Sequence, residues 1–331
     1  MSIAYRGGVS GPAPTVSVCI PTFNRPAQLA KALAAVLAQD PPAGGFEVVV
    51  ADDGSPDEDA VAEVVRKCSA NTGTPVRLVR LRPNRGPAAA RNAAWRAAAA
   101  TWIAFTDDDC APEPGWLRGL LAVADAERVA AVQGRTIPDP ELAHLLGRPF
   151  VRSLTVDSPS RFYATCNMLY RRQLLDRLGG FDESFRMALG EDTDLGWRAE
   201  ADGERIAFAP EAVVRHDVVV GTWRSELRSR RRWGDVVRVV RMHPGVRGII
   251  WRPYLHRPSH VVPLILLGLL PTLLLRPLRG VWPTAVAAVV ARDLLRDGAG
   301  RPTDRVMARL VDSYETLVVL RANLRERTLL L

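Results

Sequence analysis

The chain has 331 residues, of which 47% are hydrophobic and 24% are charged. This composition excludes an intrinsically disordered protein, and the length allows one large α/β core with a further C-terminal segment. The net charge of +8 favours an anionic partner, which could be nucleic acid, a membrane surface or a small anionic substrate.

Residues 1–14 are expected to form a flexible N-terminus, and they contain no apolar core of signal-peptide length. The chain has four scattered cysteines, Cys19, Cys68, Cys110 and Cys166, without a CxxC pair or the spacing of a zinc site. This pattern favours a reducing cytosol, and Cys19, within an apolar run, is expected to be a core thiol.

The first half of the chain alternates strands with helices. Strands are expected at residues 15–23, 46–51, 76–81 and 102–106, and helices at about residues 26–39, 57–68 and 87–99. This alternation predicts right-handed βαβ units and a mainly parallel sheet covered by helices on both faces. Polar residues directly follow three of the strands: Asn24 and Arg25, Asp52 and Asp53, and Asp107 to Asp109. Because ligands of open α/β sheets bind at the carboxyl ends of the strands, these three ends predict a single crevice.

The acidic run from Asp107 to Asp109 is the strongest chemical signal in this half. Three adjacent carboxylates raise one another's pKa unless a countercharge lies nearby. A divalent cation that also holds an anionic phosphate would supply this charge, and the alternative is a solvated acidic turn. The first strand is not followed by the glycines of a dinucleotide-binding loop, and a Walker-type phosphate loop is also missing. A bound nucleotide would therefore be held by side chains and a metal.

The second half is less regular. We expect a strand at residues 162–170, a short helix at 172–178, a segment at 187–201 that continues as a helix, and short strands at 205–209 and 213–216. From about residue 224 arginines recur, and two apolar blocks follow at residues 261–275 and 281–291. Each block is shorter than the roughly 20 residues of a membrane-spanning helix, and the first contains Pro263 and Pro271.

We therefore predict a basic and apolar helical region, residues 224–331, that associates with a membrane. The preferred arrangement is an interfacial or re-entrant hairpin flanked by arginines. Two tilted short spans and a soluble helical subdomain are the alternatives.

Five motifs resemble those of the family 2 glycosyltransferases in order and spacing. They are Val18-Cys19-Ile20-Pro21-Thr22-Phe23-Asn24-Arg25-Pro26, Asp52-Asp53-Gly54-Ser55, Asn84-Arg85-Gly86 leading to Ala90-Arg91-Asn92, Asp107-Asp108-Asp109, and Gly190-Glu191-Asp192. The likeness covers roughly residues 15–217 and implies the GT-A fold, a nucleotide-binding half fused to an acceptor half, expected here for residues 15–223. It also implies sugar transfer from a nucleotide diphosphate-sugar with inversion at the anomeric carbon.

The resemblance assigns donor binding to residues at the strand ends. Asp53 would accept from the imide N–H of uracil or thymine, and a guanidinium such as Arg91 suits the diphosphate. The predicted nucleotide-sugar contacts are Pro21 and Phe23 at the base, Asn24, Arg25, Asp53, Arg85, Arg91, Asp107 and Asp108. The predicted ligands of Mn²⁺ or Mg²⁺ are Asp109, the first choice, with Asp107 and His216. A lone histidine is more often structural, so His216 is the weaker candidate.

Asp192 matches the family's catalytic base. Inversion by single displacement needs one carboxylate to take the proton of the acceptor hydroxyl, while a metal neutralises the departing nucleotide diphosphate. Glu191, Asp194 and Trp197 are predicted on the acceptor side, although Glu191-Asp192 by itself would also suit helix capping, as would Asp194. Residues 229–233 depart from the Gln-X-X-Arg-Trp signature of processive members because Ser229 replaces the glutamine, which favours addition of one sugar.

The predicted function is thus metal-dependent, inverting transfer of a single sugar from a UDP- or dTDP-linked donor to a hydroxyl of a glycan or lipid-linked acceptor. Expected partners are the donor, the acceptor and the inner membrane surface, without nucleic acid, at the cytoplasmic face of a bacterial cell membrane. The alternative is a non-catalytic scaffold that binds sugar nucleotides or lipids. A nucleotidyltransferase would want a glycine- and lysine-rich loop after the first strand, which Asn24-Arg25-Pro26 does not provide.

Overall fold

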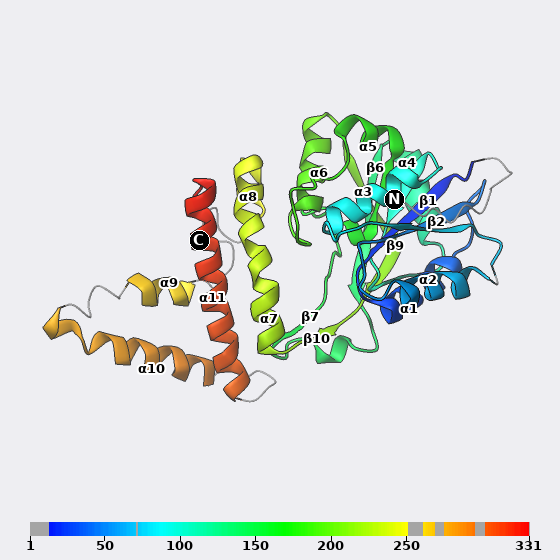
Figure 1. Ribbon diagram of the computed structural model, residues 1–331. Helices are drawn as coiled ribbons and strands as arrows, with labels where there is room; N and C mark the ends of the chain where they lie inside the picture. Colours follow the sequence, from blue (N-terminus) through cyan, green and yellow to red (C-terminus); the bar gives the residue numbers. More distant parts are fainter. Residues whose placement is uncertain (1–12, 71, 251–260, 269–274, 295–301, 331) are drawn as a thin grey trace. The chain divides into compact units, whose positions relative to one another are not determined.

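The computed structural model of the chain describes residues 13–70, 72–250, 261–268, 275–294 and 302–330. The chain divides into two compact units (Figure 1). The first unit comprises the described residues up to Ala143 and Ser153–Asp217, and the second comprises His144–Arg152 and the described residues from Val218 onward. This division falls six residues before the boundary expected after residue 223. The second unit also includes His144–Arg152, because Val151 and Arg152 pair with Val220 and Val219 of that unit.

The first unit is built on an eight-stranded, mainly parallel sheet, as the sequence predicted. Its strands are β1 (Val16–Thr22), β2 (Phe46–Asp52), β3 (Val76–Arg80), β4 (Trp102–Phe105), β5 (Cys110–Pro112), β6 (Ala131–Pro138), β8 (Met168–Arg171) and β9 (Ile206–His216). They follow the order β3-β2-β1-β4-β8-β6-β9-β5, in which β8 and β5 run antiparallel to their neighbours. The four predicted strands of the first half are the parallel set β3-β2-β1-β4.

Helices cover both faces of this sheet. They are α1 (Pro26–Leu37), α2 (Glu58–Ser69), α3 (Pro87–Ala97), α4 (Trp116–Glu127), α5 (Arg172–Leu178) and α6 (Glu191–Ala201). Strand residues alternate between two buried clusters, so Val18 packs with α1, α2 and α4 while Cys19 packs with α3, α5 and α6. Figure 1 shows α1 and α2 on one side of the blue strands and α3 on the other. Cys19 is a fully buried core thiol, as predicted.

Three helix starts follow directly from the sequence. Pro26 and Pro87 are the first residues of α1 and α3, where the missing N–H costs nothing and the fixed φ suits a helix. The side chain of Asp57 caps α2 by accepting from the N–H of Ala60 at 3.0 Å.

The second half of this unit differs from the prediction in two places. The strand expected at 162–170 is limited to β8, because Tyr163 has a φ of 52° and a 3₁₀ turn, η2 (Thr165–Asn167), precedes the strand. The two short strands expected at 205–216 form the single strand β9, whose register against β6 shifts between Gly134 and Arg135. The elements α4, β5 and β6 were not predicted.

The second unit is mainly helical. It contains the two-stranded ribbon of β7 (Val151–Arg152) and β10 (Val219–Val220), the helices α7 (Trp223–Ser229), α8 (Gly234–Met242), α9 (Val261–Gly268), α10 (Val281–Leu294) and α11 (Pro302–Glu326), and the 3₁₀ turns η3 (Arg230–Trp233), η4 (Pro244–Gly248) and η7 (Arg276–Leu278). The 3₁₀ turn η1 (Ala143–Leu145) begins at Ala143 in the first unit and continues into His144 and Leu145 of the second unit.

Buried ion pairs hold several of these helices together. Glu226 on α7 pairs with Arg152 and with Arg230, whose guanidinium also pairs with the fully buried Glu315 on α11. Of the two predicted apolar blocks, the first begins in α9 and continues into residues outside the described ranges, whereas the second lies in α10. None of the described helices combines the length and the apolar character needed to cross a bilayer.

Candidate functional site

Three neighbouring parallel strands bring their carboxyl ends to one edge of the sheet, as the sequence predicted. β1 lies between β2 and β4, with Thr22 paired to Asp52 and Cys19 paired to Phe105. The turn after β2 is tied to β1 because the N–H of Asp53 donates to the carbonyl of Thr22 at 2.9 Å. The polar residues that follow these strands therefore share one edge.

The two aspartates at the end of β2 have different partners. Asp52 is fully buried and accepts from Nε of Arg80 at 3.1 Å. Asp53 accepts from the backbone N–H groups of Arg85 at 2.8 Å and Gly86 at 2.7 Å. Burial raises the pKa of Asp53, while these two N–H groups oppose the rise. Asp53, predicted to bind the base, thus also fixes the loop that carries the third sequence motif.

This loop packs closely against residues 183–186. Gly86 has a φ of 92°, and a Cβ there would lie 2.7 Å from the carbonyl oxygen of Arg186, so no other residue fits without a shift. The guanidinium of Arg85, predicted near the diphosphate, pairs with Glu183. That guanidinium is half-exposed, so the pair can be exchanged for another anion at small cost.

The acidic run forms the turn between β4 and β5, and Arg25 neutralises part of it. Asp108 accepts from Oγ1 of Thr22 at 2.7 Å and from Nη1 of Arg25 at 3.2 Å, and the same nitrogen lies 3.1 Å from Oδ2 of Asp109. Burial raises the pKa of Asp108 to about 6, although Arg25 opposes the rise. The repulsion expected between adjacent carboxylates is therefore reduced by an arginine that was predicted as a nucleotide contact.

Arg91 joins the acidic turn to the Glu191-Asp192 motif. Its guanidinium is 5% exposed and donates to Asp107 and to Glu191, at 2.8 Å in each case. Burial and the neighbouring Asp192 raise the pKa of Glu191, while Arg91 opposes the rise. Arg91 was predicted to contact the diphosphate. That contact stays a prediction, and in this structure Arg91 links the Glu191-Asp192 motif on α6 to the acidic turn.

Asp192, the predicted base, lies in the first turn of α6 and is half-buried. Its Oδ1 accepts from the N–H of Thr193 at 2.9 Å, and its Oδ2 accepts from the N–H of Thr165 at 3.4 Å. Burial raises the pKa of Asp192, while Arg91 opposes the rise. A carboxylate whose pKa is raised is better suited to accept a proton near neutral pH.

His216 ends β9 beside the acidic turn, and its Nε2 lies 3.8 Å from Oδ1 of Asp109. Its Nδ1 lies 2.9 Å from the carbonyl oxygen of Asp217, which can only accept, so Nδ1 donates there and Nε2 is the nitrogen that faces Asp109 and could bind a cation. A carboxylate and a neutral imidazole suit a divalent cation such as Mn²⁺. Among the described residues, the group of potential ligand atoms lying within 4.8 Å of one another comprises Asp109, His216 and Cys110. Asp107, also predicted as a ligand, is held by Arg91 instead.

The other predicted donor residues lie in the turn after β1. Pro21 is buried within β1, whereas the side chain of Phe23 is exposed. Asn24 has a φ of 55°, which asparagine tolerates better than most residues, and its N–H donates to Oγ of Ser55 at 2.7 Å. The turns after β1 and β2 therefore support each other.

Asp194 and Trp197, predicted on the acceptor side, are engaged in internal contacts. Asp194 is fully buried and accepts from Nε of Arg198 at 2.8 Å. Trp197 donates to the carbonyl of Arg161 at 3.0 Å, and the Arg161 guanidinium lies 3.8 Å from its ring centroid. These contacts hold α6 in place, and a role of Asp194 and Trp197 on the acceptor side stays a prediction.

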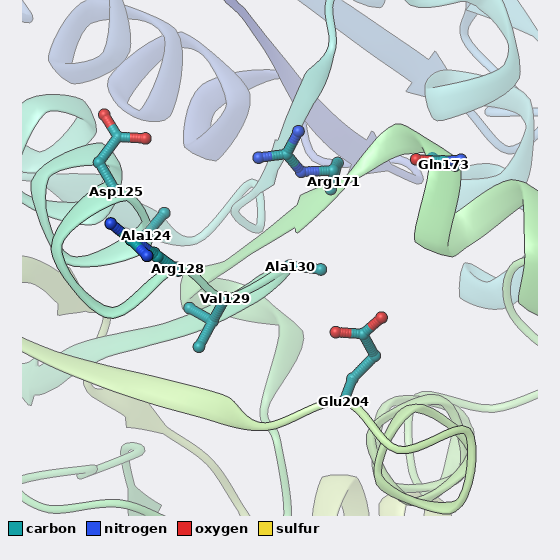
Figure 2. A pocket seen from close by; sticks show the side chains of 8 residues that line it. All are labelled: Ala124, Asp125, Arg128, Val129, Ala130, Arg171, Gln173 and Glu204. Carbon is teal, nitrogen blue, oxygen red and sulfur yellow. The ribbon is translucent and has the colours of Figure 1, made fainter.

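A hollow of about 420 Å³ lies away from these residues (Figure 2). It is lined by the end of α4, by Arg171 at the end of β8 and by Glu204. Arg171 pairs with Trp102, the first residue of β4, so the hollow lies at the amino ends of the parallel strands. It is therefore at the opposite edge of the sheet from the site.

Three residues with direct contacts in the site were missed from the sequence. Thr22 donates to Asp108, the N–H of Thr165 donates to Asp192, and Cys110 adjoins Asp109 and His216. Thr22 lies inside the first motif between two predicted contacts, and Cys110 directly follows the acidic run, so both were within reach of the sequence pattern. Thr165 lies far from any motif in the sequence, and nothing in the pattern marks it.

Comparisons with known proteins agree with this arrangement. Residues 17–179 match the family described as glycosyl transferase family 2, and residues 102–292 match glycosyl transferase family group 2. The chain is 28% identical over 228 residues to the pre-mycofactocin glycosyltransferase of Mycobacterium tuberculosis, covering 65% of this chain and 46% of that protein. It is 36% identical over 236 residues to the succinoglycan biosynthesis protein ExoU of Rhizobium meliloti, covering 64% of this chain and 66% of that protein. The matched part thus spans about half the length of the mycobacterial relative.

A solved structure is similar over nearly the whole chain. The mannosyltransferase PcManGT from Pyrobaculum calidifontis, in complex with GDP-Man and Mn²⁺, aligns with a TM-score of 0.57 at 19% identity, covering 95% of this chain and 87% of that one. At this identity the likeness concerns the fold, and it confirms the predicted GT-A architecture.

Proposed function

Because this chain belongs to glycosyltransferase family 2, we propose that it transfers one sugar from a nucleotide diphosphate-sugar to a hydroxyl of a glycan or lipid-linked acceptor, with inversion. The observation that carries this proposal is the double ion pair of Arg91. It joins Asp107, in the predicted donor motif, to Glu191, which precedes the predicted base Asp192. Two acidic motifs with different chemical tasks are thereby connected within one buried network.

The donor side of the proposed reaction uses the strand ends. Asp53 would accept from the imide N–H of a uridine or thymidine base, which a carboxylate does well because it only accepts. Asp109 and His216 would hold Mn²⁺ or Mg²⁺, and the ion when bound neutralises charge on the departing nucleotide diphosphate. Arg25 and Arg85, both half-exposed, are placed to turn toward the diphosphate oxygens.

Asp192 is the proposed general base. It takes the proton from the acceptor hydroxyl as that oxygen bonds to the anomeric carbon, and the bond from that carbon to the diphosphate oxygen breaks on the opposite side. The raised pKa of Asp192 strengthens it as a base, and the N–H groups of Thr165 and Thr193 orient its oxygens. Ser229, in place of the glutamine of processive members, supports addition of a single sugar.

The proposed base is tested by Asp192→Asn, with Asp202→Asn as the matched control at the other end of α6, where the side chain is exposed. Asp192→Asn should lower kcat by about 10² to 10⁴, the usual contribution of a general base, while the affinity for UDP changes less than about threefold. Release of nucleotide from a panel of sugar donors is the measurement. A kcat within about tenfold of the unaltered enzyme would refute the assignment, because it corresponds to only about 1.4 kcal/mol of barrier.

We also propose that the second unit binds the cytoplasmic face of a membrane, where a lipid-linked acceptor would be found. Residues 144–152 and 218–331 hold 22 arginines and 8 acidic residues, a net charge of +14, while the rest of the chain carries −6. Apolar side chains are exposed on α9 (Ile265), α10 (Val286) and α11 (Leu310, Leu317 and Leu324). Arginines beside exposed apolar residues complement anionic headgroups and the acyl layer beneath them.

Flotation of the full chain with vesicles tests this membrane proposal. Binding should be strong with vesicles that contain anionic lipid, weak with phosphatidylcholine alone, and only partly reversed by salt. The pair Leu317→Glu with Leu324→Glu should weaken binding, whereas Leu142→Glu in the first unit should not. Equal binding to both kinds of vesicle, or none to either, would refute the proposal.

A further inference from the structure

We infer that the cation site uses the thiol of Cys110 as a third ligand beside Asp109 and His216, and that this donor set selects Zn²⁺ or Co²⁺ over Mg²⁺. The inference rests on the cation site of the proposed function and concerns which ion that site prefers. Cys110 belongs to no zinc spacing in the sequence. Its partner ligand His216 lies more than a hundred residues away and reaches it only through the fold.

The sheet brings the three ligand atoms together on rigid backbone. Cys110 on β5 is directly paired with His216 on β9 in antiparallel register, which puts the two side chains on the same face. The carbonyl of Asp109 accepts from the N–H of Asp217 at 2.9 Å, so the residue before Cys110 is tied to the residue after His216. Cys110 and His216 are therefore set by the pairing of two strands, and the turn residue Asp109 is tied to them by this hydrogen bond.

The spacing of the ligand atoms suits a tetrahedral ion. Oδ1 of Asp109 lies 3.9 Å from Sγ of Cys110 and 3.8 Å from Nε2 of His216. Bond lengths to Zn²⁺ of about 2.3 Å for sulfur and about 2.1 Å for nitrogen or oxygen separate tetrahedral ligands by roughly 3.4–3.6 Å. Adjacent ligands of octahedral Mg²⁺, at about 2.1 Å, are only about 3.0 Å apart. The two distances from Oδ1 of Asp109 would have to shorten by a few tenths of an ångström to bind Zn²⁺, and by about twice as much to bind Mg²⁺.

The chemistry of the donors points the same way. Thiolate and imidazole ligands favour Zn²⁺ and Co²⁺, whereas Mg²⁺ prefers a set made only of oxygens. The bond between Nδ1 of His216 and the carbonyl of Asp217 is the kind of outer contact that orients a ligating imidazole. Cys110 is buried, and its thiol would give one proton to the buffer as the metal–sulfur bond forms. The fourth position would remain for a donor phosphate oxygen or water.

Titration of the chelator-stripped full chain with Co²⁺, without nucleotide, tests this inference. The expected result is a sulfur-to-cobalt charge-transfer band in the near ultraviolet that disappears in Cys110→Ser. Calorimetry should show the Kd for Zn²⁺ rising by at least about 100-fold in Cys110→Ser, since loss of an outer partner alone costs roughly 10- to 100-fold. The Kd for Mn²⁺ should change less than about threefold. Cys68→Ser, which removes a half-exposed thiol on α2, is the matched control and should retain the band.

Two results would overturn the inference: Co²⁺ that binds the unaltered chain without the band, or a band that persists in Cys110→Ser. The first of these results is obtained with the unaltered chain and does not depend on whether a variant folds. For the second, the thermal stability of metal-free Cys110→Ser and Cys110→Ala shows whether the variants are folded. If neither Mn²⁺ nor Co²⁺ binds the unaltered chain, with or without UDP-sugar, the cation site of the proposed function fails as well. Binding of Mn²⁺ with UDP-sugar but no sulfur band refutes only the role of Cys110.

Discussion

Replacing Arg91 with methionine removes the cation that pairs with a deeply buried acid, Glu191. The Glu191 side chain is 2% exposed, its Oε1 accepts from Arg91 at 2.8 Å, and its Oε2 has no partner among the described residues. Breaking a buried pair by removing one partner costs about 3–5 kcal/mol, because the remaining charge is left out of water. Methionine preserves most of the side-chain length, so little of this loss comes from packing.

The double variant Arg91→Met/Glu191→Gln separates this charge effect from lost contacts. Glutamine is neutral, so the unpaired buried charge disappears and about 2 kcal/mol or more of the loss should be recovered. Arg96→Met is the matched control on the same helix, where the guanidinium is half-exposed, and it should cost no more than about 1 kcal/mol.

The free energy of unfolding from urea denaturation, followed by circular dichroism at pH 9, gives these differences, because burial and Asp192 raise the pKa of Glu191 to about 8 and the carboxylate must be ionised for the charge effect to appear. The penalty of Arg91→Met should shrink as the pH falls through about 8, because Glu191 then takes up a proton. A double variant that is no more stable than Arg91→Met would refute the reasoning. A penalty below about 1 kcal/mol for Arg91→Met would do the same.

The remaining predictions concern pH, a turn and the second unit. Burial raises the pKa of Asp108 in the folded state to about 6. In the presence of a chelator, the folded protein therefore keeps this proton up to a higher pH than the unfolded chain does, and its free energy of unfolding falls as the pH rises from about 4 to about 6. This loss amounts to about 3 kcal/mol, and Asp108→Asn should flatten the slope of thermal stability against pH. Gly86→Ala, strained by its φ of 92° and by its approach to Arg186, should cost about 1–3 kcal/mol and weaken UDP binding, measured by thermal shift. Glu315→Ala should lower the free energy of unfolding in urea by about 1–3 kcal/mol, because it removes one of the two carboxylate partners of the half-buried Arg230, and unchanged stability would contradict this.

Local patterns predicted the parallel half of the sheet well. The strands that became β1 to β4 are β-branched or apolar runs bounded by polar turns, and the meeting of their ends follows from parallel topology alone. Asp109 and His216 were predicted as neighbours through the family likeness, and the structure places them 3.8 Å apart.

The unpredicted elements lack local signals. Helix α4 begins after Gly115, without a capping side chain, and contains Gly119, where a Cβ would lie 3.3 Å from Ala212. Strand β5 has three residues, too few for an alternating pattern. The prediction of a strand over 162–170 was wrong at its start because Tyr163 adopts a left-handed backbone conformation that ends an extended strand. Arg91 pairs with Glu191, 100 residues away along the chain. This contact depends on the tertiary fold, so no spacing in the sequence predicts it.

The two arginines that pair with the acidic turn, Arg25 and Arg91, also affect the stability of the first unit. Arg91 is buried and fixed, whereas the Arg25 side chain is 51% exposed and can leave Asp108 and Asp109 at little cost. With both guanidinium groups in place, three carboxylates retain about one net negative charge before any ion arrives. The polypeptide therefore does not depend on metal for its integrity, unlike a zinc finger. Chelation should abolish activity without unfolding the protein, and it should lower the melting temperature only by the mass-action contribution of the bound ion.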